Sequence, residues 1–260
     1  MGRALITGAS AGLGEEFAWA LAAEHNDLVL VARNEARLEA LAADIRQLAG
    51  VEVEVLPADL DSAAGVQAVA QRIEARQSPV TLLVNNAGMG LGQEFVGGAV
   101  RREVAAANVM VNAVLLLTHA AVKAMVARGR GTIINVASIT ALTVQGTYSA
   151  HKAWVKTFTE GLAVDLEGTG VNVTAVLPGL MHTEFHSRSQ VNSAQWPEWL
   201  FLDKERVVAA ALDAARRRQV LVVPGMLYKA AYFALKIAPR ALVRRFAGPS
   251  ISGRSVGIPD

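Results

Sequence analysis

The chain has 260 residues, 52% of them hydrophobic, and its formal net charge is +2. These values exclude a disordered or fibrous protein and argue against nucleic acid as a partner. The chain contains no cysteine, which excludes disulfides and thiolate metal sites. A strand pattern already begins at Arg3 and leaves no room for a signal peptide, so we expect a cytoplasmic protein.

The N-terminal residues combine a buried strand with a glycine-rich turn. Residues 3–7 have the pattern of a strand, and a helix runs from the turn to about Ala23. Glycines let a backbone approach a pyrophosphate, and the N-terminus of a helix supplies free N–H groups and a positive dipole. The alternative is a turn that binds no ligand. The flanking elements favour a phosphate-binding loop that comprises Gly8, Ser10, Gly12, Leu13 and Gly14.

The second predicted strand, residues 28–32, ends at Arg33 and Asn34. Arg33 lies 19 residues after Gly14, near the position where an NAD site of this architecture carries an acid. A guanidinium there can pair with a 2′-phosphate that a carboxylate would repel. The alternative is a solvated arginine at the start of a helix. We therefore predict NADP(H) rather than NAD(H), with Arg33 and Asn34 at the phosphate.

Strand and helix patterns alternate along the rest of the chain. Helices are predicted for residues 35–49, 62–75, 100–128, 147–167 and 202–218, and strands for 51–56, 80–84, 132–137, 171–177 and 219–223. This order predicts an α/β fold with a doubly wound, Rossmann-like parallel sheet, helices on both faces, and ligands at the carboxyl ends of the strands. We expect a single catalytic domain over residues 1–225, with residues 181–202 as a loop or lid over the substrate.

The stretch from Ser138 to Lys152 carries the strongest indication of chemistry. Tyr148 and Lys152 are four residues apart, so they share one face of a helix. A nearby ammonium would lower the phenol pKa from about 10 and make it a proton donor near neutral pH. Ser138, at a strand end, is placed to hydrogen-bond a substrate oxygen. Each residue alone is equally compatible with packing or solvation.

In this order, the motifs resemble those of the short-chain dehydrogenase/reductase family. The resemblance covers about Arg3 to Thr183, with a continuation to Val223. It rests on Thr7-Gly-x-x-x-Gly-x-Gly14, Asp59-Leu60, Asn85-Asn-Ala-Gly88, Asn112, Ser138, Tyr148-x-x-x-Lys152 and Pro178-Gly179.

The resemblance implies hydride transfer between nicotinamide and a carbonyl or alcohol carbon, with Tyr148 as the general acid or base. It implies that Lys152 lowers the pKa of Tyr148 and binds the nicotinamide ribose. Ser138 would orient the substrate carbonyl, and Asn112 would hold a relay water to Lys152. It also implies a homodimer or homotetramer. The implied cofactor contacts are Asp59, Leu60, Asn86, Ala87, Gly88, Tyr148, Lys152, Pro178, Gly179 and Thr183.

The resemblance has two departures. Many NADP-using members carry a basic residue where this chain has Ala11, so the NADP(H) prediction depends largely on Arg33. Nine residues separate Ser138 from Tyr148, where the family usually has twelve, so the loop that shapes the substrate pocket is short. Apolar residues of the expected lid favour a hydrophobic carbonyl compound. We therefore expect an NADPH-dependent carbonyl reductase. The rivals are a dinucleotide-binding regulator without turnover and a peripheral membrane protein that acts through its C-terminal helix.

Residues 226–260 form an amphipathic extension that is apolar, basic and divided by Pro239. This pattern fits a helix on an anionic membrane, but we expect a pocket cover or an oligomer contact. His182 and His186 are four residues apart, yet no third ligand lies nearby, so we predict no metal site.

Overall fold

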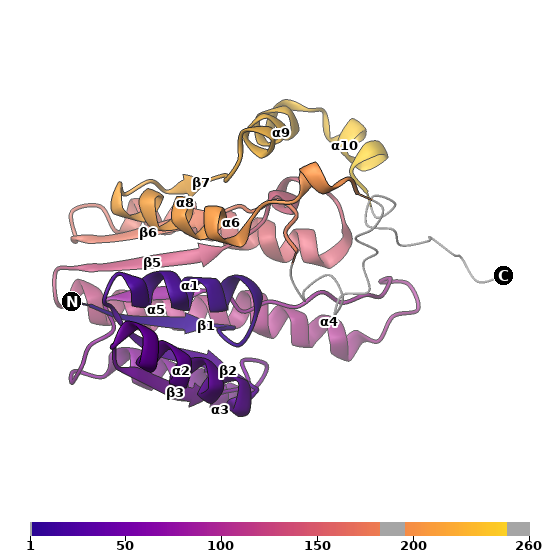
Figure 1. Ribbon diagram of the computed structural model, residues 1–260. Coiled ribbons are helices and arrows are strands. Elements are labelled where there is room, and N and C mark those ends of the chain that lie inside the picture. The colour runs from indigo at the N-terminus through magenta and orange to yellow at the C-terminus, as the bar shows by residue number, and fades with distance from the viewer. Residues whose placement is uncertain (1, 183–195, 249–260) are drawn as a thin grey trace.

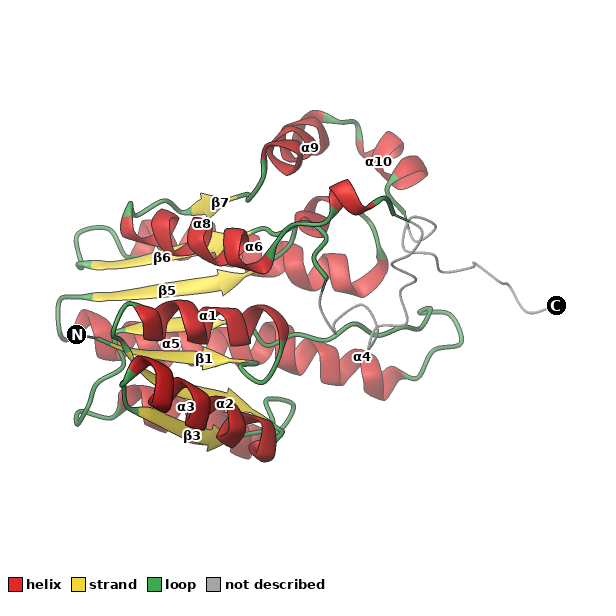
Figure 2. Cartoon of the chain, in the orientation of Figure 1, coloured by secondary structure: helices red, strands yellow, loops and turns green. Residues whose placement is uncertain are grey.

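The computed structural model describes residues 2–182 and 196–248, and strands alternate with helices along them (Figures 1 and 2). The strands are β1 (Arg3–Thr7), β2 (Asp27–Ala32), β3 (Val53–Pro57), β4 (Leu82–Asn85), β5 (Gly131–Val136), β6 (Val171–Val176) and β7 (Leu221–Val222). The main helices are α1 (Gly12–Ala23), α2 (Glu35–Ala49), α3 (Ala63–Glu74), α4 (Val100–Ala107), α5 (Ala113–Val126), α6 (Gly146–Asp165), α8 (Lys204–Arg216), α9 (Met226–Ile237) and α10 (Arg240–Phe246).

All seven strands run parallel, in the order β3-β2-β1-β4-β5-β6-β7. Ile6 of β1 pairs with Leu30 on one side and with Val84 on the other. The strand order reverses between β1 and β4, which opens a crevice at their carboxyl ends. This arrangement confirms the predicted doubly wound sheet.

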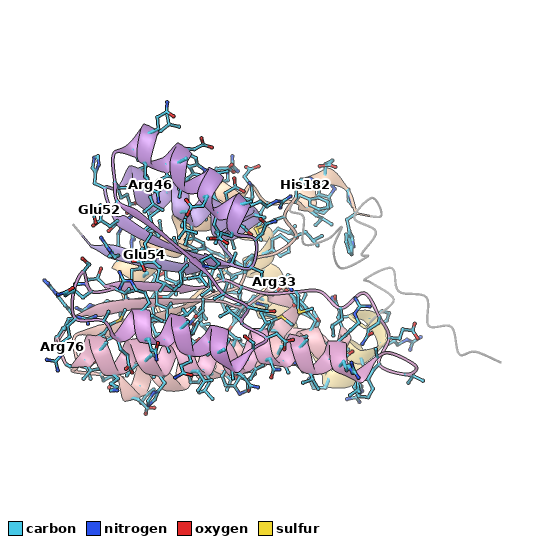
Figure 3. All side chains as sticks on the ribbon, turned by 90° about the horizontal axis from the view of Figure 1, so that it is seen from below. Arg33, Arg46, Glu52, Glu54, Arg76 and His182 are labelled. Carbon is cyan, nitrogen blue, oxygen red and sulfur yellow. The ribbon has the colours of Figure 1, made fainter. Side chains whose placement is uncertain are left out.

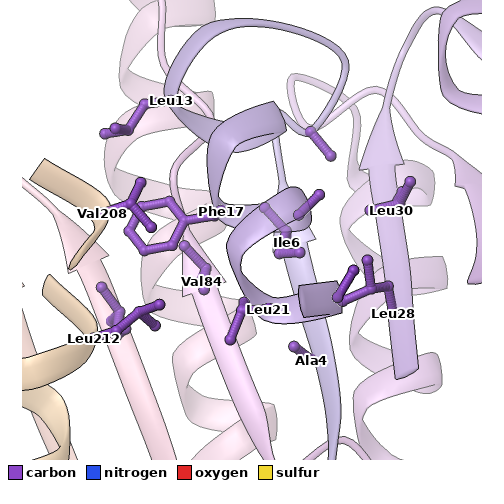
Figure 4. Packing of buried hydrophobic residues seen from close by; sticks show 14 of the residues in the cluster. Ala4, Ile6, Leu13, Phe17, Leu21, Leu28, Leu30, Val84, Val208 and Leu212 are labelled. Atoms are coloured by element: carbon purple, nitrogen blue, oxygen red, sulfur yellow. The ribbon is translucent and has the colours of Figure 1, made fainter. Parts of the chain in front are cut away.

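One face of the sheet is covered by α1, α2 and α8. Phe17 of α1 is fully buried among residues of β1, β4 and α8, including Ile6, Val84 and Val208 (Figure 4). Burying such a side chain contributes on the order of 1.5–3 kcal/mol relative to exposure. This packing fixes α1, and therefore the turn that precedes it, against the sheet.

The other face is covered by α3, α5 and α6, and it buries Val69, Leu117 and Leu166. Among the described residues, the helix Val100–Val126 is long and apolar enough to cross a membrane by length and composition. Its α5 part packs directly on the sheet, as a core helix does.

Local sequence signals explain most element boundaries. Ser62 caps α3 by accepting from the N–H of Gly65 at 3.0 Å, as expected. Gly50 ends α2 in the left-handed conformation, with φ 67°. Pro239 separates α9 from α10, also as expected.

Two elements differ from the expectations. The helix predicted for residues 100–128 contains a π-helical turn, η1 (Asn108–Asn112), between α4 and α5. The last strand is shorter than predicted, because only Leu221 and Val222 pair with β6 at the edge of the sheet.

Candidate active site

Hydrogen bonds join the glycine turn after β1 to the loop after β4. The Thr7 hydroxyl accepts from the N–H groups of Asn86 and Ala87, both at 3.0 Å. The Asn86 amide donates to the carbonyls of Thr7 and Gly8 at 3.0 and 3.3 Å. The two sides of the crevice are therefore braced together. Thr7 begins the glycine motif that carries the family resemblance, but its role as a bridge between the two loops was not predicted.

The glycines are required by contacts within the chain itself. Gly8 has φ 68°, and a Cβ at this position would lie 2.9 Å from Cα of Ala87. A Cβ on Gly14 would collide with the Gly8 carbonyl. Gly12 also has positive φ, at 62°. The turn thus adopts a shape that side chains would prevent.

The N-terminus of α1 suits an anionic group. Its N-cap, Ala11, makes no side-chain hydrogen bond, whereas Asn34 caps α2 and Ser62 caps α3. The first N–H groups of α1 thus lack a side-chain cap acceptor and can donate to a ligand. The side chain of Leu13 is buried in the core, so any contact it makes with a phosphate uses its backbone. This loop fits the pyrophosphate of a dinucleotide.

Arg33 follows directly after β2 and is exposed. Figure 3 shows it toward the loops at the carboxyl ends of the strands, while Arg76 and Glu52 lie at the opposite end. Asn34 accepts from the N–H of Arg37 at 3.0 Å, so its side chain serves as a helix cap. Arg33 is therefore available at the expected edge, while Asn34 has a structural role.

The residues after β3 lie at the same edge. Asp59 is exposed, and its carboxylate accepts from the N–H of Asp61 at 3.1 Å. Leu60 is buried. This leaves the Asp59 side chain, rather than that of Leu60, accessible to a ligand.

Ser138, Tyr148 and Lys152 come together at the end of β5. The Ser138 and Tyr148 side chains share a hydrogen bond. Lys152 is buried, and its Nζ donates to the Val136 carbonyl at 2.7 Å. The same Nζ lies 5.9 Å from the centre of the Tyr148 ring.

The short connection does not separate these residues. A single 3₁₀ turn, η2 (Ile139–Leu142), follows Ser138, and α6 begins only four residues later. The Ser149 hydroxyl lies 3.0 Å from that of Thr143 and accepts from the N–H of Gln145 at 3.0 Å. One buried serine thus stabilises the turn that brings Tyr148 back to Ser138.

The expectation for the pKa of Tyr148 was wrong in direction. Burial raises the pKa of the phenol above its ordinary value, and the hydrogen bond with Ser138 only partly opposes this. Burial also lowers the pKa of Lys152, to about 8. Desolvation disfavours the charged form of both groups. At neutral pH the phenol therefore holds its proton.

The role predicted for Asn112, holding a relay water to Lys152, stays a prediction. Asn112 is exposed, and its amide donates to Asn108 at 2.9 Å. Asn108 in turn donates to Asp61, at 2.9 Å. Side chains two positions apart on a helix point to nearly opposite sides, and the residue on the inner side is Met110.

Met110 is buried and packs in a cluster with Tyr148. A Cβ added to Gly88 would lie 3.8 Å from both the Met110 sulfur and Lys152 Nζ. An apolar thioether therefore occupies the side of η1 that faces Lys152. The sequence offered no signal for Met110, because its contact with Tyr148 is between residues far apart in the chain.

The loop after β6 closes the other side of the site. The Pro178 carbonyl accepts from the N–H of Ile139 at 3.0 Å. Gly179 packs so closely on the Tyr228 ring that a Cβ would collide with it. The Tyr228 hydroxyl accepts from the N–H of Leu180 and donates to the Leu200 carbonyl, at 3.0 and 2.8 Å. Thus α9 packs against the loop that the resemblance assigns to nicotinamide.

Thr183, predicted to contact the cofactor, and His186 lie outside the described residues. His182 is exposed, its Nε2 lies 2.8 Å from Glu198 Oε2, and its ring stacks on Phe201. Within residues 2–182 and 196–248, no three metal-ligating side chains gather.

This arrangement supplies two hydroxyl donors beside a crevice shaped for a dinucleotide. A family model described as short chain dehydrogenase matches residues 3–194. An uncharacterized oxidoreductase of Staphylococcus saprophyticus is 31% identical over 217 residues, which cover 82% of this chain and 91% of that protein.

Two solved structures share the fold over nearly the whole chain. A short-chain dehydrogenase from Sphingobium yanoikuyae in complex with NADPH is 32% identical, with a TM-score of 0.84 and coverage of 100% of this chain and 99% of that one. The bulky-bulky ketone specific alcohol dehydrogenase from Comamonas testosteroni is 28% identical, with a TM-score of 0.79 and coverage of 95% of this chain and 98% of that one. With the family model matching most of its length, the chain belongs to the short-chain dehydrogenase/reductase family of dinucleotide-binding oxidoreductases.

Proposed function

We propose that the protein is an NADPH-dependent carbonyl reductase that acts on hydrophobic carbonyl compounds. The observation that carries this proposal is the hydrogen bond between Ser138 and Tyr148 beside the buried Lys152. Two hydroxyl donors close together can both bind one carbonyl oxygen. The ammonium of Lys152 lies near enough to stabilise negative charge on the Tyr148 oxygen after the proton has left.

In the proposed mechanism, the substrate carbonyl oxygen accepts from the hydroxyls of Ser138 and Tyr148. Bound NADPH would supply a hydride to the carbonyl carbon. As negative charge develops on the oxygen, Tyr148 transfers its phenolic proton to it, and the product is the alcohol. The nearby ammonium of Lys152 stabilises the resulting phenolate.

The raised pKa of Tyr148 favours the reducing direction at neutral pH. Reduction requires a protonated phenol, which burial provides. Oxidation of an alcohol requires a phenolate to accept the proton, so we expect that direction to accelerate as the pH rises. The two directions should therefore have opposite pH dependence.

The preference for NADP(H) is proposed from Arg33. Its place immediately after β2, exposed at the carboxyl edge, puts a guanidinium where a 2′-phosphate would need one. The Sphingobium structure, which is a complex with NADPH, supports this choice.

A hydrophobic substrate is proposed from the segment that follows β6. Its described residues include Met181, Trp199 and Phe201, and Trp199 is 70% exposed. The Comamonas relative is named for bulky-bulky ketones. A large apolar carbonyl compound would bury such side chains on binding.

The test is a panel of ketones and aldehydes of increasing size and hydrophobicity, with NADPH consumption measured by absorbance and the alcohol identified by mass spectrometry. We expect turnover with bulky apolar ketones and little with short polar ones. If the protein binds NADPH tightly but reduces no member of the panel, the proposal fails and a cofactor-sensing regulator becomes the better interpretation.

We also propose a homodimer or homotetramer in the cytoplasm, built through the α5 and α6 helices. Leu115 and Leu116 of α5 and Val164 of α6 are exposed apolar residues on these helices. An interface would remove them from water. Sedimentation equilibrium measures the assembly directly, and a monomer at micromolar concentration would contradict this.

A further inference from the structure

Helix α9 has a buried face and an opposite face that is exposed and apolar. Tyr228 and Tyr232, four residues apart, are buried against the carboxyl ends of β5–β7. Phe233 and Ile237 are also four residues apart, but they are 64% and 82% exposed. Met226, seven residues before Phe233 and on the same side, is exposed as well. The outer stripe is therefore apolar although nothing in the described chain covers it.

The apolar stripe is continued by α10. Val243 is buried there, whereas Leu242 and Phe246 are 50% and 64% exposed. Figure 1 shows α9 and α10 next to each other at one end of the sheet. The two helices thus form one surface with several large exposed apolar side chains, which we call the α9–α10 face: Met226, Phe233, Ile237, Leu242 and Phe246.

The charge around this face has a single sign. Residues 226–246 contain Lys229, Lys236, Arg240, Arg244 and Arg245 and no Asp or Glu. The whole chain carries a formal net charge of only +2, so these cations are concentrated. The two lysines lie seven residues apart on α9, beside the apolar stripe. Apolar residues flanked by cations form the pattern of a helix that lies in an anionic membrane interface.

The alternative occupant, a second copy of the chain, fits the charge less well. A two-fold contact sets the same surface of each copy against the other. Ten cations would then meet with no acidic residue from this segment of either copy to compensate them. An anionic lipid surface instead offers opposite charge to each Lys or Arg near it.

We propose that the α9–α10 face binds the surface of an anionic lipid bilayer. The apolar residues enter the interface between head groups and acyl chains. The cations contact the head groups, except Arg240, which donates to the Leu142 carbonyl. This attachment is peripheral.

The location of this face links it to the site. Tyr228 contacts the loop after Pro178, and Arg240 of α10 donates to the Leu142 carbonyl at 3.0 Å, in the turn after Ser138. The inner surfaces of α9 and α10 therefore contact both loops around Tyr148, while the outer surface meets the bilayer.

The test is cosedimentation of the full chain with large unilamellar vesicles, either of phosphatidylcholine alone or of equal parts phosphatidylcholine and phosphatidylglycerol. We expect binding to the anionic vesicles at low salt, much weaker binding to the neutral ones, and release as salt screens the charges. A protein that stays in the supernatant with anionic vesicles at low salt overturns the proposal.

Two pairs of variants separate the apolar and charged contributions. Phe233→Ser with Ile237→Ser should lower the partition coefficient roughly a hundredfold or more, because two large apolar groups are lost. Lys229→Gln with Lys236→Gln should lower it by roughly tenfold to thirtyfold. Thermal unfolding followed by circular dichroism verifies that each variant is folded.

Matched controls change similar residues elsewhere. Leu48→Ser alters an apolar side chain on α2 that is 74% exposed, and Arg76→Gln with Arg101→Gln removes two exposed cations. These variants should bind vesicles as the original chain does. If they lose binding equally, or if the α9 variants change the oligomeric state while vesicle binding persists, the face is not a membrane surface.

Discussion

The two sides of the crevice are built on different principles. On the β1–β4 side, the turn is fixed by backbone contacts: Thr7 and Asn86 bridge the two strands, and Gly8 and Gly14 leave no space for a Cβ. On the β5–α6 side, Tyr148 and Lys152 are held in a desolvated environment in which burial opposes the ionisation of both groups.

The difference shows where each half is sensitive. The turn on the cofactor side depends on shape, so it does not admit added volume, whereas the rim of that side depends on the charge of Arg33. The catalytic side depends on the protonation of two groups, so a change of one atom is sufficient to inactivate it. Substitutions that keep volume and alter charge or hydrogen bonding should therefore distinguish the two sides.

The largest effect is expected for Tyr148→Phe. The variant keeps the ring in its cluster with Met110 but lacks the phenolic proton. Loss of a general acid lowers turnover by about 10²–10⁴-fold. We expect this loss in kcat, with NADPH affinity largely retained, as measured by steady-state kinetics and by quenching of tryptophan fluorescence.

Tyr232→Phe is the matched control, because it removes a phenolic hydroxyl from α9 instead. Its turnover should remain near that of the original chain. Near-normal turnover in Tyr148→Phe would contradict the proposed acid, and the same loss in both variants would indicate general damage to the fold.

The next effect is expected at the rim of the cofactor side, for Arg33→Asp. Hydrogen bonds to charged groups contribute about 1.5–3 kcal/mol, which corresponds to about tenfold to a hundredfold in preference. The variant also adds repulsion to a 2′-phosphate, so the ratio of kcat/KM for NADPH to that for NADH should fall by at least this factor. The measurement uses one substrate with both cofactors.

Arg76→Asp provides the control, since Arg76 lies at the opposite end of the sheet (Figure 3). Its cofactor ratio should not change. An original chain that uses both cofactors equally, or a ratio unaffected by Arg33→Asp, would refute the role of Arg33. A partial shift would indicate that Asn34 or Arg37 shares the phosphate.

The third effect is a change in the free energy of unfolding: Lys152→Met should stabilise the fold although it removes activity. Burial lowers the pKa of Lys152 from 10.5 to about 8, so the folded chain binds fewer protons than the unfolded chain between these values. Charged Lys152 thus opposes folding below pH 8, and this penalty disappears as the pH rises toward 10.5. Methionine avoids it but loses the hydrogen bond to Val136, which leaves a net gain on the order of 1–2 kcal/mol at pH 7.

The measurement is urea unfolding at pH 7 and near pH 10, in the original chain and in Lys152→Met. We expect the variant to be inactive and more stable at pH 7, with a smaller advantage at the higher pH. Lys156→Met, one turn along α6, removes a lysine that pairs with Glu160 at 2.6 Å and should not stabilise the fold. A Lys152→Met protein that is less stable at pH 7 would show that burial of the ammonium is fully compensated.

These contrasts also explain which features the sequence could predict. Gly50, Ser62 and Pro239 set helix ends through local backbone chemistry, so their effects could be read from neighbouring residues. The spacing of Tyr148 and Lys152 likewise fixes their common face. The raised pKa of Tyr148 could not be predicted in this way, because desolvation depends on which distant elements cover a side chain.

The sequence also could not predict which residues of the helix over residues 100–128 face the site. Asn112 was proposed because it matched a family pattern, within a helix predicted for residues 100–128. The structure has a π-helical turn at residues 108–112, and Met110 of this turn is buried in a cluster with Tyr148. π-helical turns are frequent at functional sites, but the sequence here contains no proline or other signal that would reveal one.

The smallest effect is therefore expected for Asn112→Ala. Its amide is exposed and donates to Asn108, so the loss removes one solvent-accessible hydrogen bond and should change stability by less than about 1 kcal/mol. Turnover should change by less than about threefold, because an effect of that size is under 1 kcal/mol. Met110→Ala, measured beside it, opens space next to Lys152 and Tyr148 and should alter the pH dependence of turnover as water reaches the ammonium. If Asn112→Ala instead lowers turnover tenfold or more at unchanged stability, the relay water implied by the family resemblance is held by Asn112, and the inward position of Met110 is not the one used during catalysis.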